Sequence, residues 1–175
     1  MGHLKIVVDH DKLEYNGPFD AKNLLRMIEN HIWERGFDKR MDKDFEVHSR
    51  GEKFIEWQYA PWKKITDYIS YIIKIRVLGY NLIKVDVKQN GKKTKIDNGK
   101  VIIFIDGYLL YDYDSYWDHK PFLFFMRTVY DYFVFKAYTE RFEQRLVHDI
   151  NTLHDSIEKF FNMHRHYALI SRPTT

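Results

Sequence analysis

Cysteine is absent from this 175-residue chain, which excludes disulfide bonds, thiolate metal sites and cysteine nucleophiles. Proline and glycine are scarce, at 4 and 8 residues, so collagen-like and low-complexity proteins are excluded too. The chain has no run of about 18 uncharged apolar residues, which a transmembrane helix requires. Met1–His10 also lacks the pattern of a signal peptide. We therefore expect a soluble, cytoplasmic protein that is not a transmembrane protein.

An excess of one charge sign is also lacking, because 28 Lys and Arg residues face 25 Asp and Glu residues, a net charge of +3. Such a small, evenly spread excess does not by itself indicate a nucleic-acid-binding protein. The chain contains no P-loop and no GxGxxG, GxSxG or HExxH motif. We expect no cofactor and no metal site. An enzyme is the least supported class, since spacing connects no nucleophile, base and orienting group.

Aromatic residues are abundant: 13 Tyr, 13 Phe and 4 Trp make up 17% of the chain. Such side chains bury large areas and build cores, ligand walls or interfaces. With 45% hydrophobic residues, the chain is long enough for one domain with a real core. We predict a single α+β domain over residues 1–166 and a flexible tail over residues 167–175.

The N-terminal part predicts a hairpin followed by a helix. Leu4–Val8 is a short β run, Lys12–Tyr15 is its predicted partner, and Asn16-Gly17-Pro18 is the predicted closing turn. Asp20 is placed as an N-cap before apolar residues at helical spacing, which predicts a helix over Ala21–Arg35.

The middle of the chain predicts an antiparallel meander of about six to eight strands in all. Short connections join its β runs, among which Asn90-Gly91 is the strongest hairpin signal. Leu78–Asn81 is a turn or a bulge, and Asp97–Gly99 is a second turn. The predicted strands are Phe45–His48, Lys53–Tyr59, Ile65–Val77, Leu82–Lys88, Val101–Ile105 and Tyr108–Tyr113. One sheet face is predicted to bury Ile69, Ile73, Ile75, Val85, Val101, Ile103 and Ile105.

The C-terminal part predicts a long helical region over Pro121–Met163, either continuous or broken near Lys136–Thr139. Its apolar stripe consists of Phe142, Leu146, Ile150, Leu153, Ile157 and Phe160. Meander strands of about six to eight residues are too short to cover a continuous helix of that length. Either the helix folds back, or its far half projects and pairs with a second chain.

This order of elements is similar to that of helix-grip proteins. The resemblance implies a curved antiparallel sheet that wraps a long C-terminal helix and encloses an apolar cavity. A fold does not define a function. The first hypothesis is nevertheless a non-enzymatic binding module that holds a hydrophobic small molecule in an aromatic-lined apolar cavity or surface between sheet and helix. The candidate walls are Trp57, Tyr59, Tyr71, Tyr111, Trp117 and Tyr130, and the alternative is that these residues fill the core.

Two other hypotheses stay open. The second is a structural or interaction protein that forms a homodimer through the Phe142–Phe160 stripe or through the outer sheet face, which is less polar than a solvated face. The third is a nucleic-acid-associated protein that uses the basic cluster Lys88, Lys92, Lys93 and Lys95. Because this cluster lacks arginine and aromatic residues, we expect a solvated turn there instead.

Overall fold

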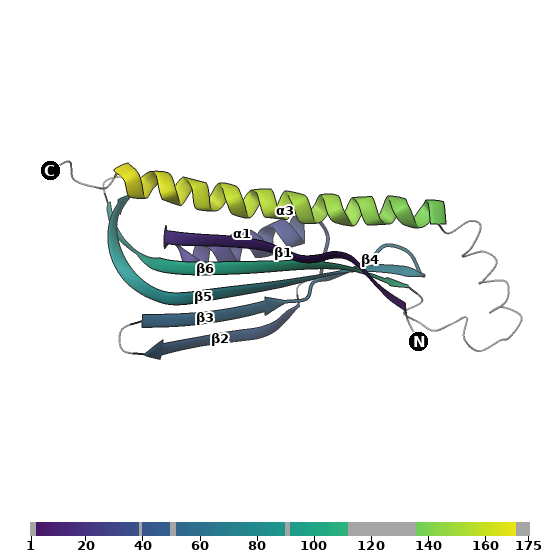
Figure 1. Cartoon of the computed structure of the whole chain (residues 1–175), viewed down its shortest axis with the longest axis horizontal. Helices are drawn as coiled ribbons and strands as arrows, with labels where there is room; N and C mark the ends of the chain where they lie inside the picture. The colour runs from purple at the N-terminus through teal and green to yellow at the C-terminus, as the bar shows by residue number, and fades with distance from the viewer. Residues whose placement is uncertain (1–2, 39, 50–51, 90–91, 112–135, 171–175) are drawn as a thin grey trace, which may run out of the picture.

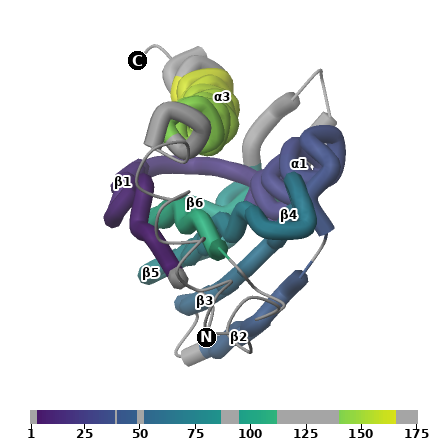
Figure 2. Tube along the Cα trace, turned by 90° about the vertical axis from the view of Figure 1, so that its right-hand side faces the viewer, coloured from purple at the N-terminus to yellow at the C-terminus, as the bar shows by residue number. Residues whose placement is uncertain are grey.

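The computed structural model describes residues 3–38, 40–49, 52–89, 92–111 and 136–170. Within these residues, six antiparallel strands form one sheet in the order β1-β6-β5-β3-β2, and β4 pairs with β5. Both described helices lie on the same side of the curved sheet (Figure 2). The predicted α+β class is confirmed, with an antiparallel sheet, one helix in the N-terminal part and a C-terminal helix packed on the sheet. The elements are β1 (His3–Phe19), α1 (Ala21–Glu34), β2 (Met41–Ser49), β3 (Glu52–Tyr59), β4 (Trp62–Lys64), β5 (Ile69–Gln89), β6 (Lys92–Tyr111) and α3 (Lys136–Ile170).

The predicted N-terminal hairpin is wrong, because β1 is one long strand that pairs with β6 from His3 to Phe19. Two register shifts between Ile6 and Asp11 bend this strand without reversing it. The turn-like triplet Asn16–Pro18 lies inside β1, at the edge of the sheet. Proline is tolerated at an edge, since one side of an edge strand has no neighbour that needs its missing N–H.

The helix prediction is confirmed, because α1 spans Ala21–Glu34 and the Asp20 side chain accepts a hydrogen bond from the backbone N–H of Asn23 at 3.1 Å. Gly36 follows the helix with φ of +74°, a left-handed conformation that glycine adopts without steric cost. The helix buries Ala21, Leu24, Ile28 and Ile32, so its apolar stripe lies on the sheet.

β5 and β6 are far longer than predicted, at 21 and 20 residues. The Leu78–Asn81 segment is a bulge in β5, where the register shifts between Tyr80 and Ile83 and Asn81 has φ of +52°. The predicted turn at Asp97–Gly99 is wrong, since Asp97 and Asn98 pair with both β1 and β5 within β6, and Gly99 pairs with β1. A Cβ on Gly99 would lie 2.7 Å from the carbonyl oxygen of Asn81, so this glycine permits a close approach of two strands.

Other predicted connections are confirmed, and one hairpin was missed. β2 and β3 pair up to Ser49 and Glu52, and β5 and β6 pair up to Gln89 and Lys92, as the predicted hairpins require. The start of the predicted Ile65–Val77 strand is instead a tight connection between β4 and β5. There the Thr66 hydroxyl oxygen accepts a hydrogen bond from the backbone N–H of Ile69 at 2.9 Å.

The predicted sheet face is buried, with one exception. Val85 is half-buried because it lies beyond the bulge of β5, where the strand leaves the centre of the core. The other six predicted residues are 0–3% exposed: Ile69, Ile73, Ile75, Val101, Ile103 and Ile105.

α3 packs lengthwise along the sheet, mainly on β1 and β6 (Figure 1). The expectation that the sheet is too short was wrong. A strand of 20 residues spans roughly 65 Å, while a helix of 35 residues spans about 52 Å. The predicted stripe is 0–8% exposed and belongs to the core of its own chain: Phe142, Leu146, Ile150, Leu153, Ile157 and Phe160. The predicted helix upstream of Lys136 lies outside the described residues.

Polar contacts also hold α3 in place. The Lys5 ammonium pairs with the Glu143 carboxylate, and the His154 ring nitrogen Nδ1 lies 2.8 Å from Asp11 Oδ2. In the part of the chain that is described, no helix is long and apolar enough to cross a membrane.

Candidate functional site

The predicted aromatic walls are mostly core. Trp57, Tyr59, Tyr71 and Tyr111 are 2–8% exposed and belong to one continuous cluster of buried residues. Trp117 and Tyr130 lie outside the described residues. The alternative hypothesis, that these aromatic side chains fill the core, therefore fits the four that the structure describes. Tyr71 differs from the others because its side chain also reaches a groove at the edge of the core.

This groove has a volume of about 430 Å³ and lies between the N-terminal half of α3 and the β4–β5 hairpin. Three residues of the hairpin form one wall and a stripe of α3 forms the other. It is lined by Lys63, Ile65, Tyr71, Arg141, Gln144, Arg145, His148 and Asp149. The α3 residues recur every three or four positions, so they share one face of the helix.

The floor of the groove is fixed by a buried hydrogen bond. The Tyr71 hydroxyl donates to the backbone carbonyl of Phe142 at 2.9 Å, which ties β5 to the first turns of α3. Burial raises the pKa of Tyr71 to about 12, although the nearby Arg145 acts in the opposite direction. The hydroxyl therefore stays protonated. The apolar part of the groove lining comes from the Tyr71 ring and the side chain of Ile65.

One cationic wall residue is held in place by its surroundings. The Lys63 ammonium donates to the backbone carbonyl of Arg35 at 2.6 Å and lies 5.5 Å from the centre of the Phe37 ring. A cation at the C-terminal end of α1 is favoured by the helix dipole. The guanidinium of Arg35, the residue that follows α1, pairs with the Asp149 carboxylate. The one carboxylate among the described lining residues therefore already has a partner.

The two arginines of the groove have no such partner among the residues that the structure describes. Arg141 and Arg145 are exposed and stand one helical turn apart. Neither forms an ion pair with a carboxylate in the described residues. Glu140 and Glu143 instead border a second hollow, together with Val7 on β1, and Glu143 pairs with Lys5. In the described part of the chain, the groove thus has three cationic side chains and one carboxylate that is already paired.

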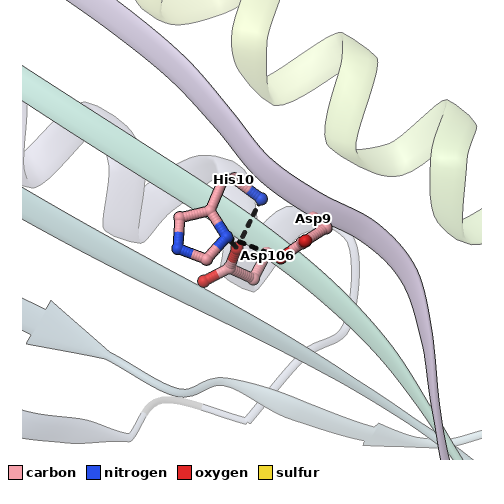
Figure 3. Close-up of side chains that lie close together, drawn as sticks. All are labelled: Asp9, His10 and Asp106. Atoms are coloured by element: carbon pink, nitrogen blue, oxygen red, sulfur yellow. Dashed lines mark hydrogen bonds and ion pairs between the residues drawn. The ribbon is translucent and has the colours of Figure 1, made fainter.

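A second group of polar residues lies on the sheet face opposite α3, where β1 bends. His10 Nδ1 is 2.5 Å from Asp9 Oδ1 and 3.6 Å from Asp106 Oδ1, and the His10 backbone N–H donates to Asp106 at 2.7 Å. Figure 3 shows one ring nitrogen turned towards the two carboxylates. His10 has φ of +52°, so the bulge of β1 creates this arrangement.

An imidazole and two carboxylates are ligand types that suit a divalent cation. Here, however, hydrogen bonding and attraction from Asp9, followed by Asp106, raise the pKa of His10. A proton on the ring competes with a metal ion, and Arg76 adds a repelling charge nearby. We assign no metal to this group. Sequence reasoning missed it because Asp106 is brought to His10 by strand pairing alone.

The predicted basic cluster lies at the closed end of the β5–β6 hairpin. Lys88 pairs with Lys93, Gln89 with Lys92, and Asp86 with Lys95 in the strand register. Lys95 is exposed. The register places these lysines far along the hairpin from Tyr71, which pairs with Leu109 near the opposite end, so the cluster and the groove are separate features.

Comparison with known proteins adds no assignment to this geometry. No family model, curated protein or solved structure matches the chain.

Proposed function

We propose that the chain is a non-enzymatic binding module that holds a small, largely apolar molecule in the groove between α3 and the β4–β5 hairpin. The observation that carries this proposal is the groove itself, with its volume of about 430 Å³ and its wall of Tyr71 and Ile65. Sites for small molecules typically measure about 300–1,000 Å³ and combine apolar walls with a few placed polar groups. The buried Tyr71–Phe142 hydrogen bond supports a wall that exists before the ligand arrives.

The test uses a neutral aromatic probe, 2-naphthalenemethanol, and two anions with the same ring system, 2-naphthoate and 2-naphthyl phosphate. Each is titrated into the full ¹⁵N-labelled chain and followed by NMR. We expect at least one probe to bind saturably and to shift the amide signals of Ile65 and Gln144. If no probe binds, or if the shifts lie elsewhere, the groove is not the binding site.

A pair of variants separates groove binding from binding elsewhere. Gln144→Trp places a large side chain in the groove and at the border of the second hollow, while Asn151→Trp places the same side chain in the second hollow alone, and both positions are exposed. We expect Gln144→Trp to abolish binding of the probe and Asn151→Trp to preserve it. Equal affinities in the two variants would contradict the proposal.

A second candidate is self-association through the outer sheet face. Its support is a cluster of aromatic and aliphatic side chains that no described element covers: Phe45, Val47, Phe54 and Tyr80, of which Phe45, Val47 and Tyr80 are 37–44% exposed. Contiguous exposed apolar patches often mark interfaces. Light scattering of the chain at high concentration tests this candidate. A dimer mass that falls to one chain in Phe45→Lys would support it, and a single-chain mass at all concentrations would reject it.

A further inference from the structure

We infer that the ligand of the groove is an amphipathic anion, with an apolar body and a carboxylate or phosphate head that Arg141 and Arg145 bind together. This inference rests on the proposed function, because it names the chemical class of the ligand for the same groove. It follows from how charge is distributed around α3.

Arg141 and Arg145 carry like charges four residues apart on one helix face, and such pairs destabilise a helix. No carboxylate in the described part of the chain forms an ion pair with either guanidinium. A guanidinium presents a planar fork of N–H donors that matches the oxygens of a carboxylate or phosphate. An oxyanion held between the two arginines would turn their mutual repulsion into attraction for the ligand.

The acidic residues nearby are positioned so that they leave this charge unneutralised. Glu143 faces β1, where it pairs with Lys5. Asp149 is the carboxylate of the groove, and it is paired with Arg35. Lys63 adds a third cation, held at the end of α1 by the carbonyl of Arg35 at 2.6 Å. Among the described residues, an anion entering the groove therefore meets an excess of positive charge.

The apolar wall argues for an amphipathic ligand over a free inorganic ion. The half-buried Ile65 lines the groove beside the arginines, together with the edge of the buried Tyr71 ring, and a bare phosphate would leave the exposed part of Ile65 in water. An aromatic or aliphatic body would cover it and gain free energy from burial. Its acid group would stay at the more exposed arginines.

The naphthalene series tests this inference, because its members share one ring system and differ in head group. We expect 2-naphthoate or 2-naphthyl phosphate to bind about tenfold more tightly than 2-naphthalenemethanol, as charge-assisted hydrogen bonds would give. Added sodium chloride should weaken binding of the anions and leave the neutral probe unaffected. Equal affinities for all three probes would overturn the inference while the proposed function stands. No binding by any probe would overturn both.

Two further arms identify the groups responsible. The double variant Arg141→Gln, Arg145→Gln should weaken binding of the preferred anion about tenfold and leave the neutral probe unchanged. Its control is the double variant Lys22→Gln, Arg26→Gln, which removes the same two charges from exposed positions on α1 and should change neither affinity. Unchanged anion binding in the double variant would assign the head to other residues and overturn the inference. Inorganic phosphate that binds as tightly as 2-naphthyl phosphate would overturn the amphipathic part.

Discussion

Ile150 of α3 lies directly over Gly107 of β6, so closely that a Cβ atom on the glycine would overlap the Ile150 Cδ1 atom. Gly107 pairs with Ile73 on one side and Val8 on the other, so it lies in the middle of the sheet. The missing side chain lets the helix approach the strand backbone. This glycine therefore sets how closely α3 packs on the sheet.

Gly107→Ala should accordingly destabilise the protein by about 1–3 kcal/mol, the usual cost of overpacking a core. Urea denaturation followed by circular dichroism measures the change. Ile150→Val alone should cost about 0.5–1.5 kcal/mol. In the double variant the shortened side chain makes room for the new methyl group, so its loss should be smaller than the sum of the two. Strictly additive losses would contradict this contact.

Tyr71→Phe removes the hydrogen bond to the Phe142 carbonyl and keeps the ring. We expect a loss of about 0.5–1.5 kcal/mol in the free energy of unfolding, the usual net value of such a bond. Tyr108→Phe is the control, because the ring of Tyr108 lies on the outer sheet face beneath the Lys74 ammonium at 5.1 Å. Its loss should stay within about 0.5 kcal/mol. Equal losses in both variants would argue against a tie between β5 and α3.

The His10 ring should titrate above its ordinary pKa of about 6.5, because Asp9 and then Asp106 stabilise its protonated form. Two-dimensional NMR of the ring protons measures this pKa directly. Asp9→Asn should lower it, and Asp106→Asn should lower it by a smaller amount. A wild-type value at or below 6.5 would mean that the three side chains do not meet in solution.

The pKa of His31 should be shifted in the opposite direction to that of His10, and this shift should make the stability of the fold depend on pH. Its burial between α1 and α3, followed by repulsion from Arg35, lowers its pKa. The unfolded chain then binds this proton more readily, so stability falls as pH drops below about 6.5 and levels off below the folded pKa. Between about pH 7.5 and 5.5, thermal unfolding should shift more in wild type than in His31→Gln. Equal shifts would show that His31 is not buried as described.

Elements defined by local sequence patterns were predicted well. Predictions failed at glycines, because a glycine can end a strand or can make room inside one for a neighbouring segment. The Asp20 cap and the apolar run Val101–Ile105 act through near neighbours, so both were found. Gly99 and Gly107 were interpreted as breaks in a strand, yet each lies inside β6 and makes room for a neighbouring segment. A glycine that breaks a strand can be distinguished from one that makes room for a neighbour only when the position of that neighbour, which is distant in the sequence, is known.

The sequence predicted an aromatic-lined cavity between the sheet and the C-terminal helix, and one of its expected wall residues lines the groove. Tyr71 was among the expected wall residues, whereas Lys63 and the arginines were not. The β4–β5 hairpin brings Lys63 to α3, and no spacing along the chain reveals that. A signal was present in Arg141 and Arg145, two like charges on one turn beside the apolar stripe. It was hidden because charged residues next to a stripe usually face solvent.

The pairing of β1 with β6 has a consequence for how the chain is made. His3 pairs with Tyr111, so β1 stays unpaired on this side until β6, the last of the described strands, has been synthesised. Until β6 is synthesised, β1 has an open edge and the apolar stripe of α1 has an incomplete sheet to pack on. Such edges and surfaces are where nascent chains aggregate or recruit chaperones. A ribosome stalled before Lys92 would leave β1 without its partner strand. Once the chain has emerged from the ribosome beyond Tyr111, β1 could pair with β6 before α3 packs on the sheet.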